Sequence, residues 1–193
     1  MILRIVTRNA HKFEEAKEIL ENFGIEATQV KVPTLEIQSE SLEEIARFRA
    51  QSINGKVEPP FATEDAGLFI RALGGFPGPF SSFVFKTIGC EGILKLLEGI
   101  EKGREAKFVS VVALLDRQGE VRIFKGELRG KISTEMRGTG GFGFDPIFIP
   151  EGFEGRTLAE LGVKIKNKIS HRAKSFSELA RWILGSYPRY KDN

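Results

Sequence analysis

The sequence predicts an α/β protein built on a mixed β-sheet. Short apolar runs alternate with helical patterns through the first half of the chain, an order typical of α/β folds. Two long β-rich runs follow one another later, which adds an antiparallel pair to that sheet. With 193 residues, the chain is long enough to form one domain, residues 1–193, with a core of its own.

The first half of the chain alternates strands and helices, each with its own start or stop signal. The expected elements are, in order, a buried strand over 2–6, a helix that Asn9 begins and Gly24 ends, a strand over 25–32, and a helix over 41–54 with Ser41 as its cap.

Glycine and proline separate the elements of the second half. The expected elements are a strand over 61–70 that an acidic pair interrupts, a loop over 74–79, a helix over 80–98 broken near Gly89, a hairpin of 106–115 and 120–128 around Gln118-Gly119, a Gly- and Pro-rich loop over 137–152, and a final helix over 171–185.

Composition excludes several classes of protein. Lys and Arg number 29 and Asp and Glu 26, so the net charge of +3 suits an anionic small ligand without demanding nucleic acid. Cys90 is the single cysteine, so an intramolecular disulfide is impossible. No apolar run approaches the roughly 20 residues that a membrane span needs. We expect a cytoplasmic protein without membrane contact.

The segment Thr7–Lys12 joins the first strand to the first helix. Free backbone N–H groups and the helix dipole favour an anion at such a terminus, and Lys12 adds a positive charge. The pattern therefore indicates either a phosphate site or an ordinary turn capped by Asn9.

Two adjacent carboxylates, Glu64 and Asp65, lie between apolar residues of a predicted strand. Adjacent strand residues point to opposite faces, and buried charges need partners or a metal. Carboxylate oxygens suit Mg²⁺, with Glu36 as a third possible ligand. The alternative is a solvated pair in a turn.

A Gly-rich segment, residues 138–146, contains the letters of a dinucleotide fingerprint but precedes Pro146 and a β-rich run instead of a helix. Pro146 should also hold Asp145 away from helical angles. The loop presents Phe142 and Phe144, whose faces suit stacking on a nucleobase, although they also suit a core.

The basic segment over 164–174 contains no acidic residue. With Ser170 as the helix cap, His171 and Arg172 fall in the first helical turn, where cations are unfavourable unless an anion or a keto oxygen is bound. The alternative is a solvated basic face.

In their order along the chain, these motifs resemble the inosine triphosphate pyrophosphatase family, which acts on non-canonical purine nucleoside triphosphates. The matching segments are Thr7, Asn9 and Lys12; Glu64–Leu68; Leu73–Pro79; Gly141–Pro146; and Lys166–Arg172. Two departures concern Ala66, where many relatives carry Thr or Ser, and a basic residue of the second helix, which is either Arg47 or Arg49.

The resemblance implies an elongated, two-lobed α/β fold around a long mixed sheet, with an active-site cleft between the lobes, and a homodimer. It also implies Mg²⁺-dependent hydrolysis of ITP, dITP and XTP to the monophosphate and pyrophosphate, which cleanses the nucleotide pool. The implied roles are Thr7, Asn9 and Lys12 on the triphosphate, Glu36, Glu64 and Asp65 on the metal or the water, Phe142, Phe144 and Asp145 around the base, and Lys166, Ser170, His171 and Arg172 on base and phosphate.

Chemistry distinguishes the roles further. We prefer Asp65 as the group that orients the water or acts as general base, with Glu36 and Glu64 nearer the metal. Lys12 and Mg²⁺ then neutralise the leaving pyrophosphate. Arg172 has only donors, so it suits the keto oxygen of hypoxanthine or xanthine and not the amino group of adenine. Two other functions stay open: a non-catalytic nucleotide or nucleic-acid binding module, and a phosphatase that releases inorganic phosphate. The acidic pair favours an enzyme over stable nucleic-acid binding.

Overall fold

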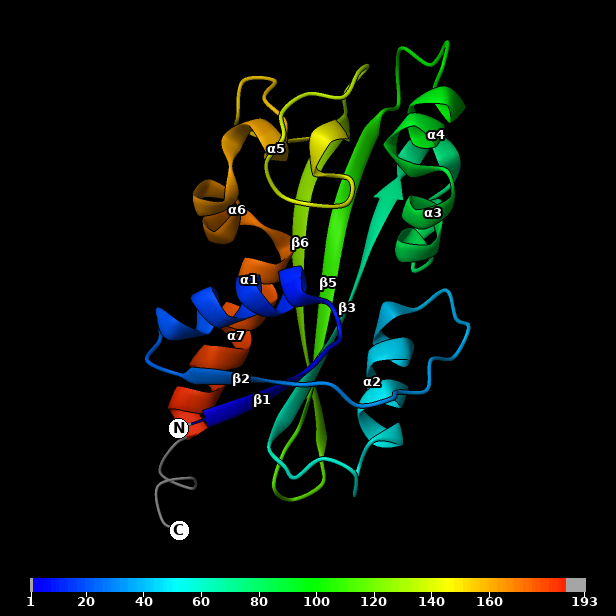
Figure 1. Ribbon diagram of the computed structural model, residues 1–193. Coiled ribbons are helices and arrows are strands. Elements are labelled where there is room, and N and C mark those ends of the chain that lie inside the picture. Colours follow the sequence, from blue (N-terminus) through cyan, green and yellow to red (C-terminus); the bar gives the residue numbers. More distant parts are fainter. Residues whose placement is uncertain (1, 187–193) are drawn as a thin grey trace. The chain divides into compact units, whose positions relative to one another are not determined.

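The computed structural model describes residues 2–186 (Figure 1). Its elements are β1 (Ile2–Val6), α1 (Ala10–Glu21), β2 (Glu26–Val30), α2 (Leu42–Ser52), β3 (Phe61–Ile70), the 3₁₀ turn η1 (Arg71–Leu73), β4 (Pro77–Gly78), α3 (Ser81–Thr87), α4 (Gly89–Leu96), β5 (Glu105–Leu115), β6 (Val121–Ile132), the 3₁₀ turn η2 (Asp145–Ile147), β7 (Phe148–Pro150), α5 (Leu158–Leu161), α6 (Val163–Ile169) and α7 (His171–Ser186).

Within the described residues, the strands form one seven-stranded sheet in the order β2-β1-β3-β5-β6-β7, with β4 paired to β3. The β1 strand lies parallel to β2 and to β3, whereas β4 and β7 lie antiparallel to β3 and β6. The sheet is therefore mixed, which confirms the predicted α/β fold class.

The chain folds into two compact units, and each unit collects separate segments of the sequence. Unit 1 comprises residues 1–65, 110–126 and 172–193, and unit 2 comprises residues 66–109 and 127–171. The chain passes between the units inside β3, β5 and β6, and once more after the first residue of α7.

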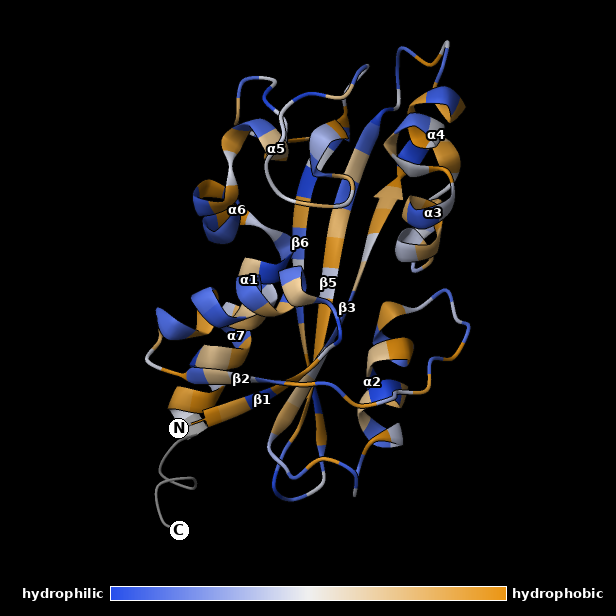
Figure 2. Cartoon of the chain, in the orientation of Figure 1, coloured by the Kyte–Doolittle hydropathy of each residue, from blue (hydrophilic) through white to orange (hydrophobic). Residues whose placement is uncertain are grey.

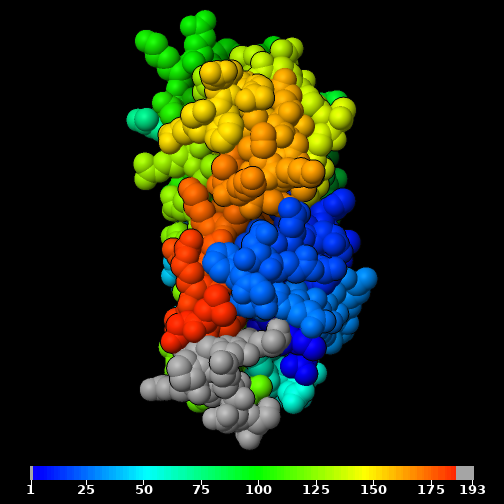
Figure 3. Space-filling model, turned by 90° about the vertical axis from the view of Figure 1, so that its left-hand side faces the viewer, coloured from blue at the N-terminus to red at the C-terminus, as the bar shows by residue number. Residues whose placement is uncertain are grey.

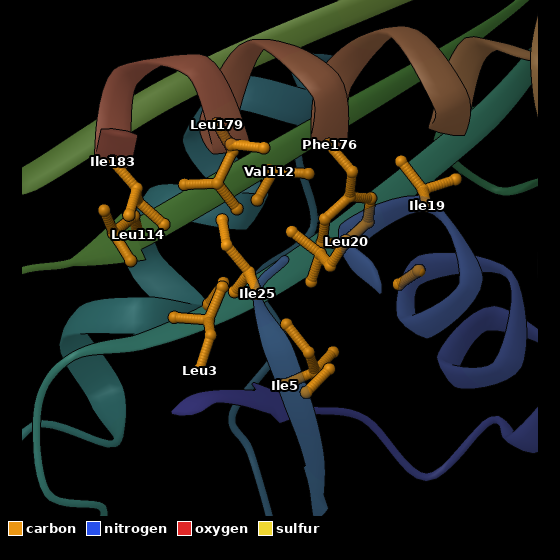
Figure 4. Packing of buried hydrophobic residues seen from close by; sticks show 14 of the residues in the cluster. Leu3, Ile5, Ile19, Leu20, Ile25, Val112, Leu114, Phe176, Leu179 and Ile183 are labelled. Atoms are coloured by element: carbon orange, nitrogen blue, oxygen red, sulfur yellow. The ribbon is translucent and has the colours of Figure 1, made fainter. Parts of the chain in front are cut away.

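The core of unit 1 lies between the strands and two helices, α1 and α7. Figure 4 shows Leu3 and Ile5 of β1 packed with Leu20 of α1 and with Phe176 and Leu179 of α7. In Figure 2, β1 is coloured as hydrophobic, whereas much of the visible side of α1 is coloured as hydrophilic. This is the pattern expected of an amphipathic helix that packs on a sheet. The two helices lie side by side in Figure 3.

Alternation along β3 separates the two faces of the sheet in unit 1. Ala62 belongs to the core formed with α1 and α7, whereas the Thr63 hydroxyl donates to the Ala46 carbonyl of α2 at 3.4 Å. Because side chains alternate along a strand, Glu64 faces α1 and α7, and Asp65 faces α2.

Unit 2 has its own core. It combines Leu68 and Ile70 of β3 with Ile93 of α4, Phe148 of β7 and Leu158 of α5, all fully buried. The helix expected over 80–98 does break near Gly89, which adopts a φ of 62° as the first residue of α4. Among residues 2–186, no helix is both long and apolar enough to cross a membrane.

Three local expectations are wrong. The acidic pair does not interrupt β3, because both carboxylates have cationic partners that offset their burial. The loop over 74–79 contains the short strand β4. Asp145 begins a 3₁₀ turn despite preceding Pro146, since proline fits the first turn of a helix; the extended segment begins at Phe148.

Candidate active site

The turn between β1 and α1 has the capping geometry that the sequence predicts. The Asn9 side chain accepts a hydrogen bond from the Lys12 backbone nitrogen at 3.1 Å, and the Thr7 hydroxyl accepts one from the Asn9 nitrogen, also at 3.1 Å. Asn9 is exposed and the Lys12 side chain is 22% exposed. The N-terminus of α1 and the Lys12 ammonium are thus accessible to an anion.

The buried carboxylate of Glu64 contacts three side chains. Its Oε2 lies 2.8 Å from the Lys12 ammonium, and its Oε1 accepts from Arg172 at 3.0 Å and from the Ser110 hydroxyl at 2.8 Å. These partners come from α1, α7 and β5, so one buried side chain connects three elements. Such charge-assisted contacts offset the cost of burying the carboxylate.

Arg172 lies in the first turn of α7 and is 2% exposed. Its Nη1 donates to Glu15 and its Nη2 to Glu64. Burial alone would lower the pKa of Arg172, but Glu64 and Glu15 outweigh it and raise that pKa, so the guanidinium stays charged. The first-turn position that the sequence assigned to Arg172 is confirmed, whereas its contact with a keto oxygen stays a prediction.

Glu15 is a residue that the sequence reasoning missed. It lies three residues after Lys12 on α1 and is buried together with Phe13 and Ala16. A carboxylate at an apolar position of a helical pattern was the available signal, because such a residue needs a buried cation.

Asp65 faces the other side of the sheet and pairs with α2. Its Oδ1 lies 2.9 Å from Nη2 of Arg49, and the same nitrogen lies 2.6 Å from Oε1 of Glu36. Arg47 instead donates to the Val121 carbonyl in an exposed position. Arg49 is therefore the basic residue of α2 that reaches the candidate site, which settles the choice that the sequence left open.

Burial changes the acidity of Asp65. It raises the pKa of this carboxyl from 3.8 to about 6, against the attraction of Arg49 and Lys12 and with the repulsion of Glu64 and Glu36. The Oδ2 atom is buried and has no hydrogen-bond partner among the described residues. A proton or a cation would satisfy this oxygen.

The carboxylates only partly form the expected metal site. Residues 2–186 contain no group of three or more His, Cys, Asp or Glu side chains arranged to hold a metal. Glu64 faces Lys12 and Arg172 on the opposite side of β3 from Asp65, and its role as a third metal ligand stays a prediction. Glu36 and Asp65 do converge on one nitrogen of Arg49, and two carboxylates suit Mg²⁺ when substrate oxygens complete its shell.

A second polar cluster lies in unit 2, around the Gly-rich loop. The Asp145 Oδ2 accepts from the Phe142 backbone nitrogen at 2.8 Å and from the Lys166 ammonium at 2.6 Å. The same ammonium lies 4.3 Å from the centroid of the Phe142 ring. Asp145 and Lys166 are both buried, so this ion pair holds the loop in one conformation.

The two phenylalanines of the loop differ in their surroundings. Phe144 is 4% exposed and contacts Phe85 edge-to-face, with the ring centroids 5.3 Å apart. It belongs to the core of unit 2, and its place in a base pocket stays a prediction. Phe142 is only partly buried and remains the ring of this loop that could stack on a base.

The basic segment of 164–174 is divided between solvent and interior. Lys164, Lys168 and Lys174 are exposed, whereas Lys166, Ser170 and His171 are buried in unit 2. The His171 ring stacks on Phe108 with the centroids 4.8 Å apart and an interplanar angle of 13°. Unit 1 begins again at Arg172, so one short segment supplies side chains to both clusters.

Fold and side chains together define a class: α/β proteins with an anion-accepting helix terminus, buried carboxylates beside cations, and an aromatic loop held by an ion pair. This chain belongs to the Ham1 family, whose sequence model matches residues 3–182. That match confirms the family resemblance that the order of the motifs indicated.

Individual relatives cover nearly the whole chain. A protein of Thermococcus kodakarensis named dITP/XTP pyrophosphatase is 53% identical over 95% of this chain and 97% of its own. A protein of the same name from Methanopyrus kandleri is 51% identical over 100% of this chain and 98% of its own. The solved structure of a HAM1 protein from Coxiella burnetii has a TM-score of 0.83 and 30% identity, covering 96% of this chain and 99% of that one.

Proposed function

We propose that this protein hydrolyses non-canonical purine nucleoside triphosphates, dITP, XTP and ITP, to the monophosphate and pyrophosphate. The observation that carries the catalytic part is Asp65, a buried carboxyl with a pKa of about 6 and an oxygen without a hydrogen-bond partner in the described part of the chain. The substrate class is supported by the names of relatives that share half of the sequence. Such a reaction would remove altered purines from the nucleotide pool.

The N-terminus of α1 suits the triphosphate. Thr7 and Asn9 order the turn, and Lys12 carries an ammonium that is partly exposed. In the structure this ammonium pairs with Glu64, and the more highly charged triphosphate would compete for it. Positive charge placed on the leaving pyrophosphate lowers the barrier to breaking the anhydride bond.

Asp65 is the proposed general base. A water molecule beside its Oδ2 would transfer a proton to that oxygen while the water oxygen bonds to phosphorus. The anhydride P–O bond breaks, and the electron pair leaves with pyrophosphate. Positioned proton acceptors of this kind contribute roughly 10²- to 10⁴-fold to a rate, and a pKa near 6 leaves Asp65 ionised at neutral pH.

Mg²⁺ is the proposed cofactor, with Glu36 and Asp65 as the residues that would hold it. When bound, it would neutralise charge on the phosphate oxygens. The pair fits because both carboxylates lie around one atom, Nη2 of Arg49, and Glu36 is exposed to solvent. Arg49 then serves to keep the two carboxylates together before the substrate arrives.

The base would be recognised by side chains from the Gly-rich loop and the basic segment. Phe142 offers a ring for stacking, and Asp145 and Lys166 fix the loop that presents it. Ser170, His171 and Arg172 follow as donors toward base or phosphate. A keto oxygen accepts from such donors, whereas the amino group of adenine does not.

Product analysis tests this proposal directly. The protein is incubated with Mg²⁺ and, separately, with dITP, XTP, ITP, dATP and dGTP, and pyrophosphate and phosphate are measured. We expect pyrophosphate from the first three substrates and little from dATP; dGTP shares the keto oxygen and shows whether recognition extends beyond that group. Release of inorganic phosphate would identify a phosphatase instead, and binding of RNA without hydrolysis would identify a binding module.

A homodimer belongs to the same proposal. Large apolar side chains are exposed on and beside α3: Phe76, Phe80, Phe83, Phe85 and Ile88. Lys86 is the single charged residue in 74–90, so two copies could meet there without repulsion. Phe83→Ser should give a monomer in sedimentation experiments, whereas Leu184→Ser, at another exposed apolar position, should not. A wild-type monomer would contradict this part of the proposal.

The expected cytoplasmic location and the absence of stable nucleic-acid binding complete the proposal. A single cysteine agrees with a reducing compartment. Lys166 and Arg172 of the basic segment are buried in ion pairs, so these two cations are not offered to a phosphate backbone.

A further inference from the structure

Four charged side chains of unit 1 form an alternating chain of ion pairs. Lys12 pairs with Glu64, Glu64 with Arg172, and Arg172 with Glu15. Lys12 and Glu15 lie one turn apart on α1, so the chain of charges begins and ends on the same helix. Two cations and two carboxylates make the group neutral as a whole. We call these residues, Lys12, Glu15, Glu64 and Arg172, the charge ring.

Glu15 holds a position that packing alone would give to an apolar residue. The other buried residues of α1 are Phe13, Ala16, Ile19 and Leu20, and Glu15 is 5% exposed among them. Buried ion pairs often add no stability compared with apolar residues of similar size, because both charges lose their hydration. Stability is therefore a weak reason for a carboxylate at this position.

The geometry gives Glu15 a different task. Glu15 and Glu64 accept from different terminal nitrogens of Arg172, which fixes both the position and the plane of the guanidinium. Glu64 cannot follow a movement of Arg172 easily, since Ser110 and Lys12 also hold it. Ser110 in turn lies 2.9 Å from the Ser175 hydroxyl, which donates to the Arg172 carbonyl.

We infer that Glu15 is a positioning residue that sets the selectivity for the base through Arg172 without touching the substrate. The inference rests on the proposed function, in which Arg172 donates to the keto oxygen. Directional donors discriminate only while their orientation is fixed, and a displacement of about 1 Å can cost about 100-fold in rate. Without Glu15, the guanidinium loses one of the two carboxylates that fix its plane, so its orientation is less tightly defined.

The test measures selectivity, the ratio of kcat/KM for dITP to kcat/KM for dATP. A loss of folded protein lowers both constants equally and leaves the ratio unchanged, so a merely structural role of Glu15 does not alter this readout. Glu15→Gln should lower the ratio about tenfold, and Glu15→Asp, which keeps the charge but shortens the side chain, about threefold. Glu14→Gln, the neighbouring exposed position of α1, is the matched control and should keep the wild-type ratio.

A double-mutant cycle with Arg172→Lys shows whether Glu15 acts through Arg172. In the Arg172→Lys background, Glu15→Gln should change the ratio by less than about twofold. An unchanged ratio in Glu15→Gln, or an equal loss in both backgrounds, would overturn the inference. If Glu15→Gln gives no folded protein, Glu15→Asp decides by the same criterion. Failure of the wild type to release pyrophosphate from dITP would instead overturn the proposed function.

Discussion

Asp65 is the proposed general base, and its ionised carboxylate lowers the free energy of unfolding because it is buried. Its pKa is about 6 in the folded protein and 3.8 without the surrounding structure. A carboxyl whose pKa is raised by folding stabilises the fold below its unfolded pKa and loses that contribution as the pH rises through the folded value. The cost of ionised Asp65 is therefore absent near pH 4 and complete above about pH 6.

Asp65→Asn should separate activity from stability. We expect kcat to fall at least about 100-fold, because the proton acceptor is lost. At pH 8 the variant should unfold at higher urea concentration, with a gain of up to about 3 kcal/mol, and at pH 4 it should resemble the wild type. Urea unfolding in EDTA at both pH values checks this, with Glu14→Gln as a control without a pH-dependent effect. An equal change at both pH values would contradict it.

Two glycines of the aromatic loop allow a matched comparison. A Cβ on Gly141 would lie 2.1 Å from the Asp145 Oδ2, whereas a Cβ on Gly143 would meet no atom within 4 Å, and both residues have positive φ, 74° and 66°. Gly143→Ala should cost only the backbone strain, about 1 kcal/mol. Gly141→Ala should cost more, displace Asp145 from Lys166, and raise the KM for dITP. Thermal unfolding and kinetics of the pair check this; equal effects in both would contradict it.

For single residues, the sequence shows which side chains need a charged partner better than it shows which residue that partner is. Glu64 and Asp65 stand out because adjacent acids within an apolar strand need partners. The choice of Arg49 over Arg47, and the pairing of Glu15 with Arg172, depend on helix register and side-chain direction, which spacing alone does not define. The sequence also does not show that Phe144 is buried while Phe142 is only partly buried. A loop has no periodic pattern from which the burial of each ring could be predicted.

The β5–β6 hairpin depends on one buried aspartate. Asp116 is fully buried, and its Oδ1 accepts from the backbone nitrogens of Gln118 and Glu120 at 3.0 and 2.9 Å. Its Oδ2 accepts from Arg122 at 3.1 Å. Removing this carboxylate leaves two turn N–H groups without their acceptor.

Asp116→Ala should therefore destabilise the protein by about 2–3 kcal/mol. Asp116→Asn keeps an acceptor oxygen for the turn and loses the ion pair, so its cost should be about 1 kcal/mol. Urea unfolding at neutral pH measures both values. If the two variants were equally stable, the turn hydrogen bonds would not be the main contribution of Asp116.

Elements with clear periodicity were predicted from the sequence, and short ones were not. The helix α7 and the strand β1 follow from repeated apolar positions, and Asn9 and Ser41 cap the helices that they were expected to cap. The helices α5 and α6 have four and seven residues, too few for a repeat to show. Because the sequence does not predict α6, it also does not predict that Lys166 on this helix is buried.

Unit 1 depends on a helix from the end of the chain. Five residues of α7 belong to its core: Ala173, Phe176, Leu179, Ala180 and Ile183. A chain ending at Ser170 should lack a cooperative unfolding transition for unit 1 and should bind a dye specific for exposed apolar surface. The complete chain is the control and should show a cooperative transition for unit 1. Cooperative unfolding of the shorter chain with unchanged amplitude would contradict this dependence.

The order of the segments also governs how the protein emerges from the ribosome. Both segments of unit 2 are synthesised by residue 171, whereas unit 1 needs the residues that follow. The ribosome makes Glu15 157 residues and Glu64 108 residues before it makes Arg172. Until then the two carboxylates lack the cation that joins them in the folded protein, so burial of this part of unit 1 is unfavourable before Arg172 is made.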